Sequence, residues 1–447
     1  SAIAGDDYTA IAPGATISIA NGSDTGTFTV TVINDALVEL DETVNVEIIS
    51  PSLDSISIAD GQASATISSE DTGQASLSVT TNGDENGPTN VAYTLTLDKV
   101  NNTGATVYFD LVDLGTGTAV AGDDYVPFGT APFSILDGAS SVTFIVFVND
   151  DDLLENTETL NVEARDQVAG RPFTVDPANN SATANIVDDE TATASLTVLQ
   201  GGSENGPTSL VYTVLLSTVN STGSAITFDL TDTGTGTATS GSDYTAIPAG
   251  AQISIADGAL IGAYTVTVTD DTLLEGNETV VLEISNPSLA SITLGTSITA
   301  GGITDNDTAT ANLSVTVNGN EAGPVDIEYT VTLDKVNNTG NAITFDLDDG
   351  GTGDATAGLD YAAFGDEIIG IADGATTGTF TVTVFDDLLL EGEERVGGIL
   401  TSPSLSSVSI NDGLATATIL DDDTADAVLS TCLLYTSDAA DDSKRVW

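Results

Sequence analysis

The sequence predicts an all-β chain built from tandem two-sheet sandwiches, and three observations support this prediction. Thr, Val, Ile, Gly and Ser dominate the 447 residues while Met and His are absent, a composition that favours strands and turns over helices. Segments such as "AYTVTVT" (263–269) alternate apolar and Thr side chains, as half-buried strands do. A set of short motifs also returns at a regular distance along the chain.

The repeating unit has the size of a domain. The phrase "ASLSVTTNGDENGP" begins at Ala75 and has counterparts at Ala194 and Ala311, a period of roughly 117 residues that is too long for a solenoid coil or a propeller blade. Each copy then carries a Gly-x-Asp-Tyr, an acidic loop and a closing acidic cluster. We expect copy one (1–74, lacking its first strands), copy two (75–193), copy three (194–310), copy four (311–426), and the start of a truncated repeat with a non-native tail (427–447).

The sequence of each whole copy predicts about seven short strands, the number typical of a sandwich of ~100 residues. In copy three "SLVYTVLLS", "AITFDL", "AQISI", "AYTVTVT" and "TVVLEIS" are the clearest, and clusters of Gly, Asn and Asp separate them. No segment has a helical period, apart from one expected turn inside the acidic loop. No apolar run approaches ~20 residues, so the sequence predicts no membrane-spanning helix.

The chain is strongly acidic, with 68 Asp and Glu against 7 Lys and Arg and a net charge of −61. Nucleic acid and anionic membranes bind basic patches, so the charge excludes both as partners. It suits divalent cations, or solubility in salty surroundings. The single cysteine, Cys432, excludes an intrachain disulfide framework.

The acidic loop keeps one spacing, Asp-x3-Glu-x2-Glu, in all four copies. The instances are Asp35/Glu39/Glu42, Asp151/Glu155/Glu158, Asp271/Glu275/Glu278 and Asp387/Glu391/Glu394. Positions i, i+4 and i+7 share one face of a helical turn, so we expect the three carboxylates to converge. Two carboxylates ~4 Å apart repel by about 4 kcal/mol at an effective dielectric of ~20, and several such pairs rival a domain's stability of ~5–15 kcal/mol.

Salt bridges cannot offset this repulsion in copy three, because residues 194–310 contain neither Lys nor Arg. Water, protons or a metal ion remain. Many hard oxygen ligands, with no His and no usable Cys, favour Ca²⁺ over zinc or copper. Mg²⁺ fits less well because it keeps several of its waters.

The motifs "ENGP", "GTGTATSGSDY", "TVTDDTLLEGNET" and "ITDNDT" follow one another in copy three. In this order they resemble the Calx-beta domain, which occurs in sodium–calcium exchangers and in tandem in bacterial surface proteins, and the resemblance covers residues 1–426. It implies seven-stranded, antiparallel, immunoglobulin-like sandwiches that gather Ca²⁺ ligands at one end. The implied ligands of copy one are Asp7, Asp35, Glu39, Glu42 and Asp71. Those of copy two are Glu85, Asp124, Asp150, Asp151, Glu155, Glu158, Asp188, Asp189 and Glu190. Those of copy three are Glu204, Asp243, Asp270, Asp271, Glu275, Glu278, Asp305 and Asp307. Those of copy four are Glu321, Asp360, Asp386, Asp387, Glu391, Glu394, Asp421, Asp422 and Asp423.

Some positions depart from the pattern. Copy one lacks the opening Glu and has Asn34 and Ser69 where its siblings have Asp, so we expect a weak site there. In copy three Asn306 interrupts the closing acidic run, so the number of ions is expected to differ between copies.

The resemblance implies a calcium-binding structural array within an extracellular bacterial adhesin or surface stalk. Ca²⁺ would stiffen the domains and the hinges, and the partners would be neighbouring repeats and other cell-surface or matrix molecules. The alternative is a calcium-responsive module that binds glycan or protein. An exposed aromatic cluster would favour that alternative, and aromatic residues make up only 5 % of the chain.

Four further interpretations concern salt adaptation, catalysis, glycosylation and the motif tyrosines. Salt adaptation explains acidic residues, although it would scatter them rather than repeat one spacing. Paired carboxylates serve glycosidases, but these recur identically in every copy without His or a nucleophile elbow, so we expect no enzyme. "NNT" (101–103, 337–339) and "NST" (220–222) match the N-glycosylation sequon. The tyrosines of Gly-x-Asp-Tyr are expected to fill the core with hydrated hydroxyls: Tyr8, Tyr125, Tyr244 and Tyr361.

The C-terminal stretch "TCLLYTSDAADDSKRVW" breaks the repeat pattern. "CLLYTSDAADD" resembles a translated sequencing adapter. We therefore expect residues 431–447 to lack a stable place in the array.

Overall fold

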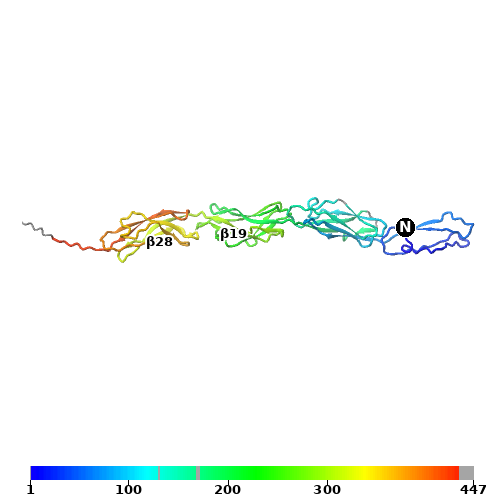
Figure 1. Cartoon of the computed structure of the whole chain (residues 1–447), viewed down its shortest axis with the longest axis horizontal. Coiled ribbons are helices and arrows are strands. Elements are labelled where there is room, and N and C mark those ends of the chain that lie inside the picture. The colour runs from blue at the N-terminus through cyan, green and yellow to red at the C-terminus, as the bar shows by residue number, and fades with distance from the viewer. Residues whose placement is uncertain (1, 129–130, 168–171, 432–447) are drawn as a thin grey trace, which may run out of the picture.

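The structure, a computed structural model, describes residues 2–128, 131–167 and 172–431. Within these ranges the regular secondary structure consists of strands with no helix, which confirms the predicted all-β class. The four copies lie end to end and form one long, thin row (Figure 1). In the described part of the chain, no helix has the length and apolar character to cross a membrane.

Copy two is a sandwich of a four-stranded and a five-stranded sheet. The first sheet has the order β10 (Phe173–Val175), β3 (Gly73–Thr81), β5 (Val91–Leu97) and β8 (Ser141–Val146). The second has the order β4 (Gly83–Asp84), β11 (Ser181–Val187), β9 (Glu158–Asp166), β6 (Val107–Asp113) and β7 (Ala131–Ile135). The seven longer strands pair antiparallel, as predicted. The sequence did not predict the short β4 and β10, which pair parallel with β11 and β3.

Copies three and four repeat this topology. In copy three the four-stranded sheet has the order β17 (Ile261–Val266), β14 (Leu210–Leu216), β12 (Ala192–Gln200) and β20 (Ile292–Leu294). Its five-stranded sheet has the order β13 (Gly202–Ser203), β21 (Ile298–Thr304), β19 (Glu278–Ser285), β15 (Ile226–Asp232) and β16 (Gln252–Ile255). In copy four the four-stranded sheet has the order β28 (Thr377–Val382), β24 (Ile327–Leu333), β22 (Ala309–Val317) and β30 (Val408–Asp412). Its five-stranded sheet has the order β23 (Gly319–Asn320), β31 (Leu414–Leu420), β29 (Glu394–Thr401), β26 (Ile343–Asp349) and β27 (Glu367–Ile371).

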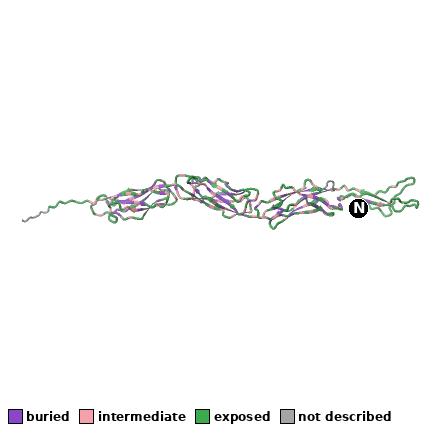
Figure 2. Ribbon diagram, turned by 90° about the horizontal axis from the view of Figure 1, so that it is seen from above, coloured by how far each residue is buried: buried purple, intermediate pink, exposed green. Residues whose placement is uncertain are grey.

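Buried residues lie along the strands of each whole sandwich (Figure 2). They come from alternate strand positions, because successive side chains of a strand point to opposite faces. In copy three Tyr212 of β14 is fully buried and its hydroxyl donates to the Val280 carbonyl of β19 at 2.7 Å. This bond links the two sheets across the core, and Tyr93 and Tyr329 make the equivalent bond in copies two and four.

The described part of copy one contains one two-stranded sheet, β1 (Glu42–Glu47) paired with β2 (Gln62–Ile67). Apolar side chains beside it stay exposed, among them Ile48, Ile49 and Leu53. Burial is correspondingly sparse at this end of the row (Figure 2). A single sheet cannot form a sandwich core, because an apolar face needs a second layer to cover it.

The chain leaves its last strand at Leu420, and residues 421–431 form no strand. Val428 and Leu429 are exposed. The expectation for the tail concerns mainly residues 432–447, including Cys432 and Tyr435. These lie outside the described residues, so that expectation stays a prediction.

Candidate metal centre

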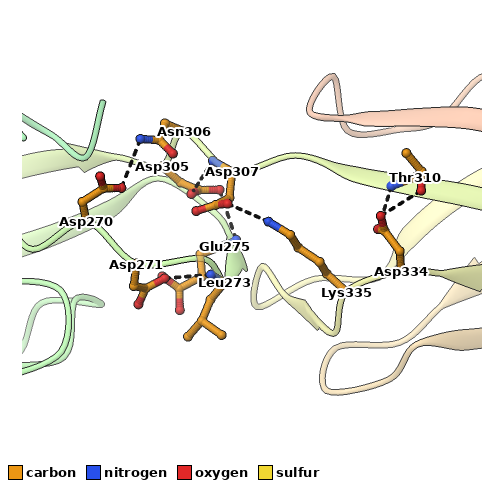
Figure 3. Close-up of polar contacts among 10 residues, drawn as sticks. All are labelled: Asp270, Asp271, Leu273, Glu275, Asp305, Asn306, Asp307, Thr310, Asp334 and Lys335. Atoms are coloured by element: carbon orange, nitrogen blue, oxygen red, sulfur yellow. Dashed lines mark hydrogen bonds and ion pairs between the residues drawn. The ribbon is translucent and has the colours of Figure 1, made fainter. Parts of the chain in front are cut away.

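Four loops meet at one end of each whole sandwich, where the chain passes into the next copy. In copy three the first loop follows β13 and carries Glu204, and the second, between β15 and β16, carries Asp243. The acidic loop joins β17 to β19, and the closing acidic run joins β21 to β22 of copy four. The site therefore lies at the junction between two sandwiches (Figure 3).

The aspartate of Gly-x-Asp-Tyr is fixed by its own backbone turn. Gly241 has φ 90°, in the left-handed region that glycine adopts without steric cost. Oδ2 of Asp243 accepts a hydrogen bond from the Thr239 backbone N at 2.5 Å. The same carboxyl group is hydrogen-bonded to the Glu278 side chain. Both contacts recur elsewhere: Asp124 with Val120 and Glu158, and Asp360 with Thr356 and Glu394.

The tyrosine of this motif fills the core as predicted, but the predicted hydrated hydroxyl is wrong for the three whole copies. The Tyr244 hydroxyl donates to Oδ2 of Asp232 at 2.5 Å, and the ring is buried. Burial and the Asp232 carboxylate raise the pKa of Tyr244 to about 12. The equivalent bonds join Tyr125 to Asp113 and Tyr361 to Asp349. The tyrosine thus anchors the loop through Asp232, which is not a predicted ligand.

The acidic loop is extended, and the predicted helical turn inside it is wrong. Leu274 and Glu275 form the short strand β18 (Leu274–Glu275), which pairs parallel with β25 (Asn337–Asn338) of copy four. This pairing with the neighbouring sandwich holds Leu274 and Glu275 extended, while the Glu275 backbone N donates to Asp305 of its own copy. Oδ1 of Asp271 accepts from the Leu273 backbone N at 2.7 Å and closes the turn before the strand.

The carboxylates converge nevertheless, in neighbouring groups rather than in one cluster. In each group the nearest carboxylate oxygens lie within 4.8 Å of one another. One kind of group joins the Gly-x-Asp-Tyr aspartate to the two loop glutamates: Asp7/Glu39/Glu42 and Asp124/Glu155/Glu158. The other joins the opening glutamate to the closing acids: Glu85/Asp188/Glu190 and Glu204/Asp305/Asp307. A further group consists of Asp150, Asp189 and Glu190.

The remaining predicted residues lie around these groups. The closing run is tied to the acidic loop, because Oδ2 of Asp305 accepts from the Glu275 backbone N at 3.1 Å. Asp421 and Glu391 repeat this bond at 2.8 Å. Asp270 accepts from the Asn306 side chain at 3.3 Å, at the edge of the site (Figure 3). Charges close enough to raise a neighbouring carboxyl's pKa come from Asp35, Asp71, Asp151, Asp271, Asp386, Asp387 and Asp422.

Burial beside like charges raises the pKa of the central glutamates above their usual 4.5. Desolvation, followed by the charges of Asp151 and Asp188, raises the pKa of Glu85 to about 8. Desolvation and the hydrogen bond to Asp243 raise the pKa of Glu278 to about 8. At neutral pH these groups therefore take up protons or pair with cations, because full ionisation is electrostatically unfavourable.

The donor atoms fit a calcium ion. Ser291 apart, every buried side-chain oxygen without a hydrogen-bond partner in the described ranges belongs to a predicted ligand. Glu85, Glu204 and Glu321 are the most buried of these ligands, with 4 %, 2 % and 3 % of their surface exposed. A buried polar group without a partner costs about 1–3 kcal/mol, and more when charged. Ca²⁺ takes six to eight oxygen ligands, so it would satisfy several of these atoms at once.

The same acidic loop also contributes to the core of the next sandwich, a role that the sequence interpretation missed. Val38, Leu154 and Leu274 are fully buried, and each packs in the hydrophobic core of the following copy. In each loop this aliphatic residue directly precedes the first glutamate, so one side of the loop faces the carboxylates and the other enters the neighbour. Its constant position in four loops was the available signal.

The sequon asparagines pair through their backbone with these aliphatic residues. Leu154 forms a parallel bridge with Asn220, as Val38 does with Asn101. Asn220 is fully buried, and its Nδ2 donates to the carbonyls of Ser224 at 2.8 Å and Ile255 at 3.0 Å. The sequon interpretation is therefore wrong for the folded chain, because this side-chain nitrogen is buried and hydrogen-bonded. Asn101 and Asn337 make the same contacts.

Fold and site together define a chain of tandem β-sandwiches with oxygen-rich groups at the sandwich ends. The sequence model of the Calx-beta domain matches residues 1–73, 90–190, 208–307 and 326–423. The chain belongs to the Calx-beta family, as its motifs predicted. No curated protein matches it significantly.

Several solved structures are similar to parts of the chain. The apo-form Calx CBD1 domain is 24 % identical over 26 % of this chain and 100 % of its own, with a TM-score of 0.22. The calcium binding domain CBD12 of CALX1.1 is 17 % identical over 51 % of this chain and 99 % of its own, with a TM-score of 0.23. Activated alpha-2-macroglobulin of Escherichia coli is 11 % identical over 80 % of this chain and 34 % of its own, with a TM-score of 0.16. Similarities this low add nothing to the family assignment.

Proposed function

We propose that the chain is a calcium-binding structural array. The observation that carries this proposal is the set of buried, unpartnered carboxylate oxygens at the sandwich ends, headed by Glu85, Glu204 and Glu321. The calcium-binding character named for the similar domain CBD12 of CALX1.1 agrees with it. Bound calcium ions would supply the positive charge that each acidic cluster lacks and would remove the repulsion between its carboxylates.

The role is mechanical. The copies lie end to end, and the loops that carry the carboxylates also insert Val38, Leu154 and Leu274 into the neighbouring cores. An ion at such a loop would order both the loop and the contact to the next sandwich. The proposed protein is an extracellular stalk or adhesin array of a bacterial surface, without catalytic activity, that holds another domain at a distance. Tyr93, Tyr212 and Tyr329 are buried in the sandwich cores, so these rings do not contribute a surface for a glycan.

Small-angle scattering and thermal unfolding of the full chain, with calcium and then with chelator, test the mechanical role. Ligand binding to the native state stabilises it by about 2.7 kcal/mol at a hundredfold excess over Kd. We expect a higher Tm and a longer maximum dimension with calcium than without it. An unchanged Tm together with an unchanged maximum dimension would exclude a calcium-stiffened stalk.

A further inference from the structure

The lysines of residues 1–431 are Lys99 and Lys335, and both occupy the same position of the repeat, in "LDKVNN" (97–102, 333–338). Each reaches back from its own sandwich to the closing acid of the preceding copy. Nζ of Lys99 lies 3.0 Å from Oδ1 of Asp71, and Nζ of Lys335 lies 2.6 Å from Oδ1 of Asp307 (Figure 3). In a chain with 68 acidic and 7 basic residues, two bases are thus placed at matching junctions.

Each of these lysines places a positive charge beside a closing aspartate of the carboxylate site. Asp307 is grouped with Glu204 and Asp305, whose oxygens lie within 4.8 Å of one another. The Lys335 ammonium contacts one oxygen of Asp307, while the other oxygen, Oδ2, is buried without a partner. A fixed positive charge from copy four therefore lies beside the group, and the expectation that no salt bridge offsets the repulsion in copy three is wrong, because the lysine comes from the next copy. The ion pair between Lys335 and Asp307 also links copy three to copy four, because the aspartate belongs to copy three and the lysine to copy four.

The junction between copies two and three lacks this charge. There "LSTVNS" (216–221) places Thr218 at the lysine position, and Glu190 replaces the closing aspartate. Among the described residues, no ion pair crosses this junction. Glu190 forms a group with Glu85 and Asp188, and each of these three side chains has a buried oxygen without a partner. Glu85 is 4 % exposed here and Glu204 is 2 % exposed at the Lys335 junction, and both have a buried oxygen without a partner. The described residues of the two junctions therefore differ in the fixed positive charge, which only the Lys335 junction has.

We propose that Lys99 and Lys335 act as built-in cations that keep their junctions closed without calcium, so that the junction between copies two and three is the calcium-operated joint of the array. This inference rests on the proposed calcium binding. Leu154 stays inserted in copy three, and Nδ2 of Asn156 donates to the Thr222 carbonyl at 2.8 Å. Loss of the ion would therefore allow bending about these contacts rather than separation of the two copies.

Distances between spin labels on the full chain test the proposal. Cysteines replace Ser141, Ile261 and Thr377, which are exposed and occupy matching positions of β8, β17 and β28, in a Cys432→Ser background. In chelator, the 141–261 distance distribution should widen roughly twofold or more, as a released hinge does, and calcium should narrow it again. The 261–377 distribution, across the Lys335 junction, should change little.

Exchange of the cation provides the matched control. Thr218→Lys with Glu190→Asp should keep the 141–261 distribution narrow in chelator. Lys335→Thr should widen the 261–377 distribution in chelator, an effect that does not depend on calcium binding. Equal widening at both junctions of the unchanged chain, or exchanged residues that leave both distributions as they were, would overturn the proposal. Failure of calcium binding would instead appear as distributions that calcium does not alter.

Discussion

Leu154 of copy two is fully buried in the core of copy three, where it pairs with Asn220. It lies next to Glu155, whose carboxyl is grouped with those of Asp124 and Glu158 in the candidate metal centre of copy two. One loop thus serves two sandwiches, and changes to its two sides should have separable effects.

The aliphatic side of the loop should govern the stability of the next sandwich. Leu154→Ala removes a fully buried leucine, which costs about 2–5 kcal/mol in a well-packed core. Hydrogen exchange should therefore accelerate in strands β12 to β21 of copy three more than in copy two. Leu390 occupies the same position in copy four but is 61 % exposed, so Leu390→Ala should change exchange very little. Faster exchange confined to copy two would contradict the assignment of Leu154 to its neighbour's core.

The left-handed turn should be needed to place Asp243. Gly241→Ala puts a Cβ at φ 90°, a conformation that costs about 1–2 kcal/mol for a non-glycine residue, although no atom lies within 4 Å of the new Cβ. We expect a lower Tm and weaker calcium binding in copy three. Gly365→Ala is the control, because its Cβ also meets nothing and its φ is not positive. Equal effects of the two substitutions, measured by thermal unfolding, would contradict a conformational role for Gly241.

The buried side chain of Asn220 should be structural. Asn220→Ala removes the bonds that Asn220 donates to the Ser224 and Ile255 carbonyls and those that it accepts from Thr222, and a buried polar group that loses its partner costs about 1–3 kcal/mol. The midpoint of denaturant unfolding should fall for copy three. Asn21→Ala, at an exposed loop residue of copy one, is the control and should have no effect. An unchanged midpoint for Asn220→Ala would mean that these bonds contribute nothing to stability.

The ion-free chain should lose stability as the pH rises. The pKa of Glu85 and Glu158 is raised to about 8 and that of Glu204 to about 7, against 4.5 for an ordinary glutamate. Between about pH 4.5 and 8 the folded state therefore binds more protons than the unfolded state, and its stability falls with increasing pH.

Thermal unfolding in metal-free buffers should give a lower Tm at pH 8 than at pH 5. Calcium binds the ionised carboxylates, so the increase in Tm that it causes should be largest at pH 8. A Tm that rises with pH in the absence of metal would contradict the account of the buried glutamates.

The repeat pattern predicted the fold well because strand periodicity and turn residues are local properties. The fixed spacing of Glu155 and Glu158 also predicted that they meet, and the structure places both beside Asp124. The predicted helical turn was wrong because the loop backbone pairs with the next copy, as Leu274 does with Asn337. Contacts between copies cannot be derived from the pattern of one copy. For the same reason the burial of Leu154 and the lysine contacts of Lys99 and Lys335 emerged only from the structure.

Equilibrium dialysis of the full chain against calcium, with bound metal counted per chain, tests the central claim most directly. The unchanged chain should bind several calcium ions. The variant Glu204→Gln with Asp305→Asn keeps the shapes of two grouped side chains and removes their charges, so it should lose the ions of copy three alone. The control substitution Asp257→Asn, at a residue that is not a predicted ligand and that accepts a hydrogen bond from the Gly223 backbone N, should lose none. A chain that binds no calcium at millimolar concentration, or a double variant that binds as many ions as the unchanged chain, would contradict the account.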